Sequence, residues 1–330
     1  MQLDNVERLG DGQLTEVLAL CRTAKTVDEV APLSEQVLLA ARGGQPAGST
    51  TGSSHFLAYA GTHLAGYAHL ERGLAGQATT AELVVDPAHR RQGVGTALVH
   101  SLETALRPET VGPETVGPQT ETLQVWSHGH LEGARAFAVR DGYSVVRELW
   151  AMRRSLSDAD SLPAVCLPEG FRTRHFVIGQ DEDAWLRVNA RAFVDHPEQG
   201  RTTRHDLDLR IAEPWFDATG FILIEDIRGL APVLAASHWT KVVPADDPQV
   251  SPTQGEVYVV GVDPAYQGLG LGRAVTALGL AHLRDRGLTE AMLYVDADNS
   301  AAVATYSRLG FARFTVDVMY SRAVHAPVSG

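Results

Sequence analysis

Two segments of the chain, one in each half, carry glycines at a spacing that could bind phosphate groups. Residues 90–95 read Arg-Arg-Gln-Gly-Val-Gly, and residues 267–272 read Gln-Gly-Leu-Gly-Leu-Gly. Glycines let a backbone approach a phosphate closely, and the N–H groups at the start of a helix attract an anion. Both segments, of the form (Arg/Gln)-x-x-Gly-x-Gly, therefore predict an anion held by backbone amides.

The surroundings of the two segments also repeat. Each follows an apolar strand that ends at Asp-Pro (86–87 and 263–264), since proline has no N–H for the strand ladder. Each precedes an amphipathic stretch, and a helix-ending glycine follows at Gly142 and at Gly310. A tight turn would explain one such segment, but two copies in matching order indicate a duplicated domain.

Two other phosphate-binding motifs fit less well. A P-loop ends in Gly-Lys-Ser/Thr, and neither segment does. A dinucleotide fingerprint needs GxGxxG near the start of a βαβ unit, whereas the second segment has Arg273 at the place of the third glycine. Dinucleotide binding is therefore not expected.

Length and charge limit the remaining classes of protein. The chain has 330 residues, enough for two domains of about 150 residues each. Its 28 basic and 40 acidic residues give a net charge of −12, which disfavours nucleic acid and membrane surfaces as partners. Without a long apolar run or an export signal, we expect a cytoplasmic protein, and we expect it to be a monomer.

The cysteines and histidines do not predict a metal site. Cys21 and Cys166 are far apart, form no CxxC pair, and are expected to be small core residues of a reduced protein. His128-Gly129-His130 is interpreted as a turn at a strand end.

The shared landmarks also give the expected domain boundaries. We expect an N-terminal domain over residues 1–155, a linker over residues 156–169, and a C-terminal domain over residues 170–325. The first half is longer between its glycine loop and Gly142, largely because the pentapeptide Pro-Glu-Thr-Val-Gly occurs twice, over residues 108–117. This insertion is predicted to be a solvated surface segment.

In both halves the glycine segments resemble the acyl-CoA-binding motif of the GNAT superfamily of N-acetyltransferases. The resemblance implies two tandem GNAT acyl-CoA N-acyltransferase domains of α/β class with mixed sheets, acetyl-CoA as the acetyl donor, and no metal. Segments of the second half, among them residues 196–200, 238–241 and 255–264, are similar to one branch of the superfamily. That branch acetylates the cysteinyl amine of cysteinyl-glucosaminyl-inositol, which is then the expected acceptor.

Acetyl transfer to an amine needs a neutral amine and a proton for the departing thiolate. The resemblance implies that Glu256 is the base, directly or through a water, and that Tyr306 is the acid; a strand-edge carboxylate and a packed tyrosine are the structural alternatives. By residue count, their counterparts in the first half are Thr79 and Ala138, which cannot fill these roles. We therefore expect a catalytic second domain and a non-catalytic first domain that holds acetyl-CoA as a structural or vestigial ligand.

The resemblance also implies the binding residues. Acceptor contacts are expected at Glu35, Glu198, Lys241, Glu256 and Tyr294, so both domains would contribute, and Arg90, Arg91 and Arg273 would attract the phosphates. The coenzyme contacts expected in the first half are Leu83, Val84, Val85, Arg91, Gln92, Gly93, Val94, Gly95 and Thr96. Those expected in the second half are Val260, Gly261, Val262, Gln267, Gly268, Leu269, Gly270, Leu271, Gly272, Arg273, Asn299, Ser300, Ala301, Ala302, Val303 and Ala304.

Two other functions stay open at the level of sequence. A tandem acetyltransferase could act on another primary amine, such as an aminoglycoside or a protein N-terminus. A non-catalytic protein could use the same loops to sense or bind acyl-CoA.

Overall fold

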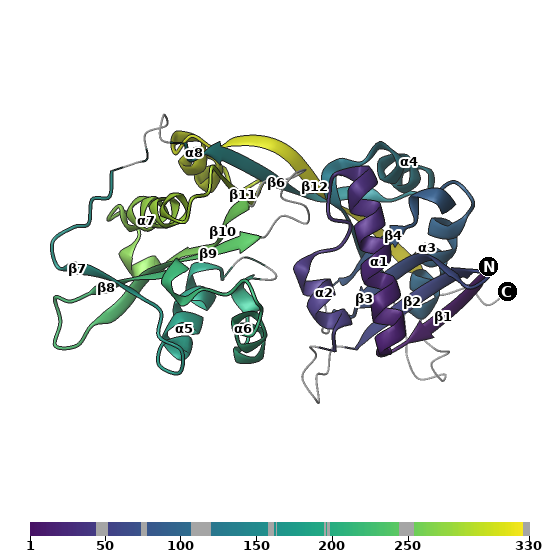
Figure 1. The fold of residues 1–330 in the computed structure, drawn as a ribbon, viewed down its shortest axis with the longest axis horizontal. Helices are drawn as coiled ribbons and strands as arrows, with labels where there is room; N and C mark the ends of the chain where they lie inside the picture. Colours follow the sequence, from purple (N-terminus) through teal and green to yellow (C-terminus); the bar gives the residue numbers. More distant parts are fainter. Residues whose placement is uncertain are drawn as a thin grey trace. The chain divides into compact units, whose positions relative to one another are not determined.

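A computed structural model describes residues 1–43, 52–73, 78–106, 120–157, 162, 164–194, 196, 199–243 and 254–325. The chain forms two compact units (Figure 1): unit 1 contains residues 1–149 and 315–330, and unit 2 contains residues 150–314. The duplicated pentapeptide, Glu198 and part of the expected linker lie outside the described residues.

The carboxyl-terminal strand explains why the compact units differ from the expected domains. β6 (Ser144–Ser155) begins in unit 1 and ends in unit 2, whereas β12 (Ala312–His325) begins in unit 2 and ends in unit 1. Within unit 1, residues 318–325 of β12 pair antiparallel with β5 (Thr120–Ser127). The sequence landmarks placed residues 150–155 in the first domain and residues 315–325 in the second. In the structure, residues 150–155 belong to unit 2 and residues 315–325 to unit 1.

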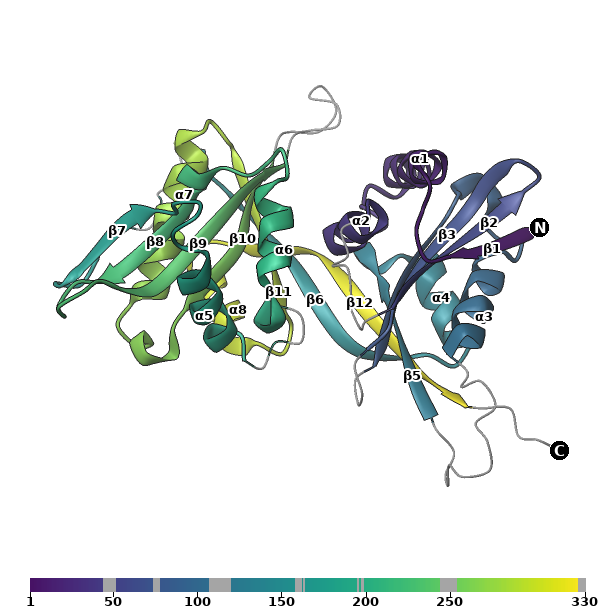
Figure 2. The ribbon, with the colours of Figure 1, turned by 90° about the horizontal axis from the view of Figure 1, so that it is seen from below.

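Unit 1 is a mixed sheet with helices on both faces. Its strand order is β1 (Gln2–Val6), β2 (Ser53–Ala60), β3 (His63–Glu71), β4 (Thr79–Val85), β5 and β12. β4 and β5 are parallel, and the other pairs named here are antiparallel. Figure 2 shows α1 (Asp11–Asp28) and α2 (Glu35–Ala41) on one face, and α3 (Val94–Leu106) and α4 (Glu132–Arg140) on the other.

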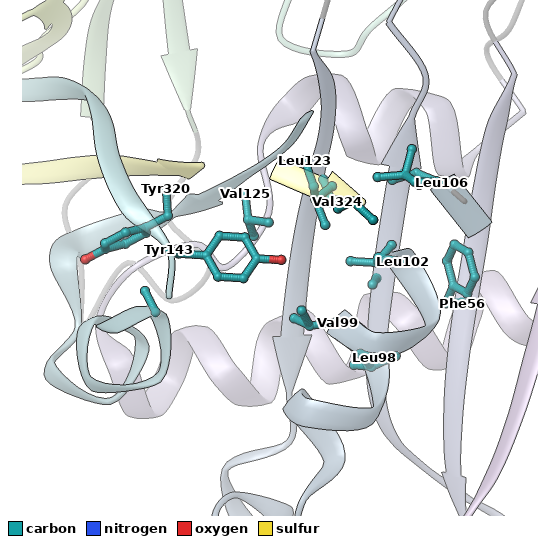
Figure 3. Packing of buried hydrophobic residues seen from close by; sticks show 14 of the residues in the cluster. Phe56, Leu98, Val99, Leu102, Leu106, Leu123, Val125, Tyr143, Tyr320 and Val324 are labelled. Atoms are coloured by element: carbon teal, nitrogen blue, oxygen red, sulfur yellow. The ribbon is translucent and has the colours of Figure 1, made fainter. Parts of the chain in front are cut away.

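The amphipathic stretch after the first glycine loop packs as its spacing predicts. Leu98, Leu102 and Leu106 of α3 are fully buried against the sheet, where Phe56 and Leu123 lie (Figure 3). Residues four apart share one helix face, and each buried leucine contributes about 2–3 kcal/mol through removal of apolar surface from water. This packing fixes the start of α3 against β4.

Unit 2 repeats this architecture. Its strand order is β6, β11 (Glu290–Asp296), β10 (Gln254–Val262), β9 (Val233–Val243), β8 (Phe221–Asp226) and β7 (Phe171–His175). Figure 1 shows α5 (Glu182–Ala192) and α6 (Arg204–Ile211) on one face, and α7 (Leu271–Asp285) and α8 (Ser300–Arg308) on the other. Among the described residues, no helix combines the length and the apolar character that a membrane span needs.

The Asp-Pro pairs end the strands as the sequence predicts. The carboxylates of Asp86 and Asp263 accept the N–H of Ala88 and Ala265, at 2.8 and 2.9 Å. These contacts cap the short 3₁₀ helices η1 (Pro87–His89) and η5 (Pro264–Tyr266), which lead into the glycine loops. The two strand–loop–helix junctions are therefore copies of one local structure.

Neither cysteine is a fully buried core residue. Cys21 is half-buried in unit 1, and burial raises the pKa of its thiol to about 12. Cys166 is exposed, so the expectation that it packs in a core was wrong. Its segment lies before β7 and outside any helix or strand, and such connecting segments run over the surface.

A buried ion network holds β12 in unit 1. His128 follows β5 in a turn, as predicted, and its Nδ1 lies 2.8 Å from Asp317 while its Nε2 lies 3.3 Å from Glu82. The N–H groups of Gly129 and Ser34 donate to the same two carboxylates, at 2.8 and 2.6 Å. Burial alone would lower the pKa of His128, but the two carboxylates outweigh it and raise this pKa to about 10.

The network predicts how the stability of unit 1 depends on pH. Because the folded-state pKa of His128 lies above its ordinary value of 6.5, protonation stabilises unit 1 fully below about pH 6.5, and this contribution is lost as the pH rises towards 10. Asp317→Asn removes one partner of a buried charge and should destabilise unit 1 by about 3–5 kcal/mol at pH 6, with a weaker pH dependence.

Urea unfolding followed by pulsed hydrogen exchange of β5 peptides measures this effect. Asp141→Asn is the control, because the Asp141–Arg140 pair is more exposed and should contribute less than about 1 kcal/mol. Equal stability of Asp317→Asn and the wild-type protein at pH 6 would contradict the assignment.

Candidate active site

The two glycine loops have the same backbone conformation. Gly268 and Gly270 have φ angles of 80° and 79°, and their counterparts Arg91 and Gly93 have φ angles of 63° and 87°. Residues with side chains disfavour this left-handed region, which explains the glycines at positions 93, 268 and 270. Arg91 adopts the left-handed conformation although it is not a glycine. The loop geometry of unit 1 is thus retained although its sequence departs from the second copy.

Each loop leads directly into a helix. The N–H of Ala97 donates to Gly93 and the N–H of Ala274 donates to Gly270, at 3.0 and 3.1 Å, so α3 and α7 begin at equivalent positions. The first N–H groups of a helix have no acceptor within the helix, and here they follow exposed loop residues. Both loops therefore have the backbone needed to bind a pyrophosphate.

The arginines near the loops are not equally available to a ligand. Arg91 and Arg273 are exposed, as a role in attracting phosphates requires. Arg90 instead forms a two-pronged ion pair with Asp28 of α1, at 2.7 and 2.6 Å, and donates to the carbonyl of Val85. Its charge is neutralised inside unit 1, so the expectation that Arg90 supplies free positive potential was wrong.

A β-bulge distinguishes β10 from its counterpart β4. Val257 pairs with Thr240 and Val259 pairs with Trp239, so Tyr258 is an extra residue in the ladder with β9. The β3–β4 ladder runs from Gly66–Val85 to Glu71–Thr80 without such a shift. A bulge bends its strand and increases the local twist.

Immediately before the bulge, β10 and β11 stop pairing. Among the described residues, their parallel ladder consists of Gly255–Ala291 and Glu256–Met292, although both strands continue further. The corresponding parallel ladder of unit 1, between β4 and β5, is longer and joins Thr79–Glu82 to Leu123–Trp126. Beyond Glu256, β10 therefore has no ladder with β11 in the described part of the chain, and it continues to Val262 before η5 and the glycine loop.

Three expected acceptor-binding residues lie on one face of the unit 2 sheet. Glu256 is the cross-strand partner of Lys241, and Glu256 pairs in register with Met292 of β11, two residues before Tyr294. Side chains opposite each other or two apart on a strand share a face. The structure thus brings Glu256, Lys241 and Tyr294 to the same face, where Tyr294 is 46% exposed.

Aromatic rings hold Lys241 on this face. Its Nζ lies 4.6 Å from the ring centroid of Trp215 and 5.0 Å from that of the bulge residue Tyr258. Arg210 of α6 donates to the Tyr258 hydroxyl at 2.8 Å. The ring faces attract the ammonium group and orient it, and the strand register places Lys241 directly across from Glu256. No role was expected for Tyr258, Trp215 or Arg210 from the sequence, because a bulge and its neighbours depend on strand pairing.

Tyr306 approaches from the opposite face. It lies on α8 and packs against the core that contains Ala291, Leu293 and Phe311, with its ring 5.9 Å from that of Phe311. Burial raises the pKa of Tyr306 to about 12, so its hydroxyl stays protonated at neutral pH. A hydroxyl that keeps its proton can act as a general acid when a bond to a leaving group breaks.

Strand register refines the comparison of the two halves. The β3–β4 pair Glu71–Thr80 matches the β9–β10 pair Lys241–Glu256, so Thr80 occupies the place of Glu256. The residue count gave Thr79, because it did not include the bulge. Tyr306 does match Ala138, since the N–H groups of Phe311 and Tyr143 donate to these residues at 3.0 and 2.9 Å.

The other expected residues take varied positions. Asn299 caps α8 by accepting the N–H of Ala302 at 3.0 Å. In the first half, Leu83 and Val85 face α3, whereas Val84 is buried in the core formed by α1 and α2. Glu35 is half-buried in the first turn of α2 in unit 1.

Two protein-family profiles match the chain. The one described as "Acetyltransferase (GNAT) family" covers residues 190–311, and the one described as "Acetyltransferase (GNAT) domain" covers residues 51–143. A tandem GNAT protein from the clavulanic acid biosynthesis pathway has the same fold, with a TM-score of 0.70, 16% identity, and coverage of 98% of this chain and 99% of that one. An N-acetyltransferase of this superfamily from Sphaerobacter thermophilus gives a TM-score of 0.63 at 21% identity, with coverage of 99% and 97%. Fold and loops thus define a tandem GNAT acetyltransferase, as expected.

Relatives that match nearly the whole chain show which family of GNAT acetyltransferases the chain resembles. The mycothiol acetyltransferase of Geodermatophilus obscurus is 48% identical over 319 residues, which cover 97% of each chain. That of Thermomonospora curvata is 50% identical over 313 residues, which cover 94% of each chain. The chain therefore belongs to the mycothiol acetyltransferase family, and acetyl-CoA-dependent N-acetyl transfer is its activity.

The second loop predicts a charge-sensitive variant. Gly270→Glu places a carboxylate beside the first amides of α7, where repulsion of a few kcal/mol from the coenzyme phosphates should lower kcat/KM for acetyl-CoA roughly 100-fold. Gly287→Glu is the matched control, because Gly287 also has a left-handed φ, of 81°, and open space around its Cβ position. Steady-state kinetics of both variants give the comparison, and equal kcat/KM values would exclude the second loop from the site.

Proposed function

We propose that unit 2 transfers the acetyl group of acetyl-CoA to the cysteinyl amine of cysteinyl-glucosaminyl-inositol, which yields mycothiol and free CoA. The observation that carries this proposal is the position of Glu256, next to Lys241 and at the last residue pair before β10 and β11 diverge. The acceptor is proposed from the function of the relatives, whose name refers to mycothiol.

Acetyl-CoA is proposed to bind along β10 and the second glycine loop. The amides of Gly268–Arg273 would hold the pyrophosphate, and Val260–Val262 would offer backbone groups to the pantetheine arm. In support, β10 has no ladder with β11 beyond Glu256 in the described part of both strands, so no strand pairing competes with a ligand along Val260–Val262 on that edge. Asn299–Ala304 would bind the coenzyme from the start of α8.

Glu256 is proposed to take the proton from the amine. The acceptor arrives largely as an ammonium, which has no lone pair, and a carboxylate base, acting directly or through a water, makes it nucleophilic. The nitrogen then attacks the thioester carbonyl, and the C–S bond breaks as the tetrahedral intermediate collapses. Lys241 and Tyr294, on the same face, would contact the polar acceptor.

Tyr306 is proposed to protonate the thiolate that leaves. Its raised pKa keeps the hydroxyl protonated, and α8 lies on the face opposite Glu256, so base and acid would approach the reacting bond from two sides of the diverging strands. The proton lost by the amine and the proton gained by the thiolate balance over one turnover.

Unit 1 is proposed to be non-catalytic and to keep a coenzyme loop as a structural or vestigial site. Thr80 and Ala138 stand where unit 2 has Glu256 and Tyr306, and neither side chain can serve as base or acid at neutral pH. The roles of Glu35 and Glu198 in acceptor binding stay predictions. We also propose that one chain suffices for activity, and sedimentation of the active enzyme would test this.

Mass-spectrometric detection of the acetylated product tests the choice of acceptor. With acetyl-CoA as donor, cysteinyl-glucosaminyl-inositol should be acetylated with a far higher kcat/KM than glucosaminyl-inositol, an aminoglycoside or a peptide N-terminus. Preference for one of the other amines would keep the acetyltransferase but replace the acceptor. Absence of turnover with every amine would instead favour an acyl-CoA sensor.

Two variants should separate chemistry from binding. Glu256→Gln and Tyr306→Phe keep the side-chain shapes but remove the base and the acid, so each should lower kcat by about 100-fold or more. Isothermal titration with acetyl-CoA should give nearly unchanged Kd values for both. A wild-type kcat in either variant would refute the role of that residue, and Thr80→Val, the matched change in unit 1, controls for effects of strand substitution.

A further inference from the structure

Unit 1 contains a cluster of metal-ligating side chains that the acetyl transfer does not use. His63 is the first residue of β3, Asp86 follows the last residue of β4, and His89 ends η1. One ligand atom from each of the three residues lies within 4.8 Å of the others. The cluster directly precedes the first glycine loop.

The two imidazoles converge on one carboxylate oxygen. His63 Nε2 lies 2.5 Å from Asp86 Oδ2, and His89 Nδ1 lies 3.4 Å from the same oxygen. The rings are stacked, with centroids 4.9 Å apart and planes 24° apart. His89 Nδ1 is buried and forms no hydrogen bond within the described part of the chain. Because most buried polar side-chain atoms are hydrogen-bonded, this ring nitrogen calls for a partner such as a bound ion.

Unit 2 shows that the local fold does not need these histidines. Asp263 caps η5 as Asp86 caps η1, and the N–H groups of Asp86 and Asp263 donate to Ala65 and Ala235, both at 2.9 Å. By this match, Val233 is the unit 2 counterpart of His63, and Tyr266 is the unit 2 counterpart of His89. The same strand–turn–helix junction therefore forms with one ligand-type side chain in place of three.

We propose that His63, Asp86 and His89 form a binding site for a borderline divalent transition-metal ion, with Zn²⁺ as the probe ion. Two imidazoles and a carboxylate are a donor set typical of zinc, whereas magnesium and calcium prefer oxygen donors alone. The His63 side chain is 57% exposed, which leaves a path for the ion and room for a water ligand. Bound metal would link the start of β3 to η1 and so stabilise the first glycine loop.

Zinc titration of the tag-free, chelator-treated full-length chain against a chromophoric chelator tests the site. The wild-type protein should bind one equivalent tightly and gain thermal stability. The double variant His63→Val/His89→Tyr, which copies the unit 2 residues, should bind this equivalent at least about tenfold more weakly and gain no stability. His63→Gln is the second variant, because this exposed position tolerates change, and circular dichroism checks that both variants fold.

Cys166→Ser and His196→Ala are the controls, since Cys166 is exposed and His196 lies 3.3 Å from Asp296 in unit 2. Both should bind zinc as the wild-type protein does. Equal zinc affinity of the wild-type protein, the double variant and His63→Gln would overturn the proposal, as would loss of the tight equivalent in either control.

Discussion

One extra residue in a β-ladder distinguishes the strand that carries the candidate base of unit 2 from its counterpart in unit 1. Tyr258 is inserted between Val257 and Val259 in the pairing of β10 with β9, and the ladder with β11 extends no further than Glu256 among the described residues. The bulge lies between the candidate base and the coenzyme loop. The Tyr258 ring also contacts Lys241, so a single insertion shapes both the strand and the polar face beside it.

The two units share one backbone framework but differ in the side chains that surround the glycine loop. Both keep the Asp-Pro cap, the left-handed loop residues and the helix start. In unit 1 several charged groups near the loop are bound internally: Arg90 pairs with Asp28, and Glu82 pairs with His128. In unit 2 the equivalent strand carries Glu256 and Tyr258 instead. By strand register, however, Glu256 corresponds to the uncharged Thr80 and Glu82 corresponds to Val259, so the internal pairs of the first copy are absent from these positions in the second.

Local sequence was enough to predict the repeated fold and the loops. The glycines, the Asp-Pro pairs and the leucine spacing of α3 act within a few residues, and the structure has each as expected. Three of the differences come from distant pairing. Arg90 meets Asp28 from 62 residues earlier, β12 returns to unit 1, and Thr80 replaces Thr79 as the counterpart of Glu256 because a bulge adds a residue. An apolar strand sequence does not reveal where a bulge lies, since both strands show similar apolar runs.

Acetyl-CoA is proposed to react on the bulged strand of unit 2. Hydrogen exchange followed by mass spectrometry, with and without saturating acetyl-CoA, tests it most directly, because it reports backbone amides at both loops at once. The coenzyme should protect residues 257–262 and 267–273 from exchange, whatever happens at residues 91–96. Protection confined to the first loop, with unchanged exchange on β10 and at the start of α7, would contradict it.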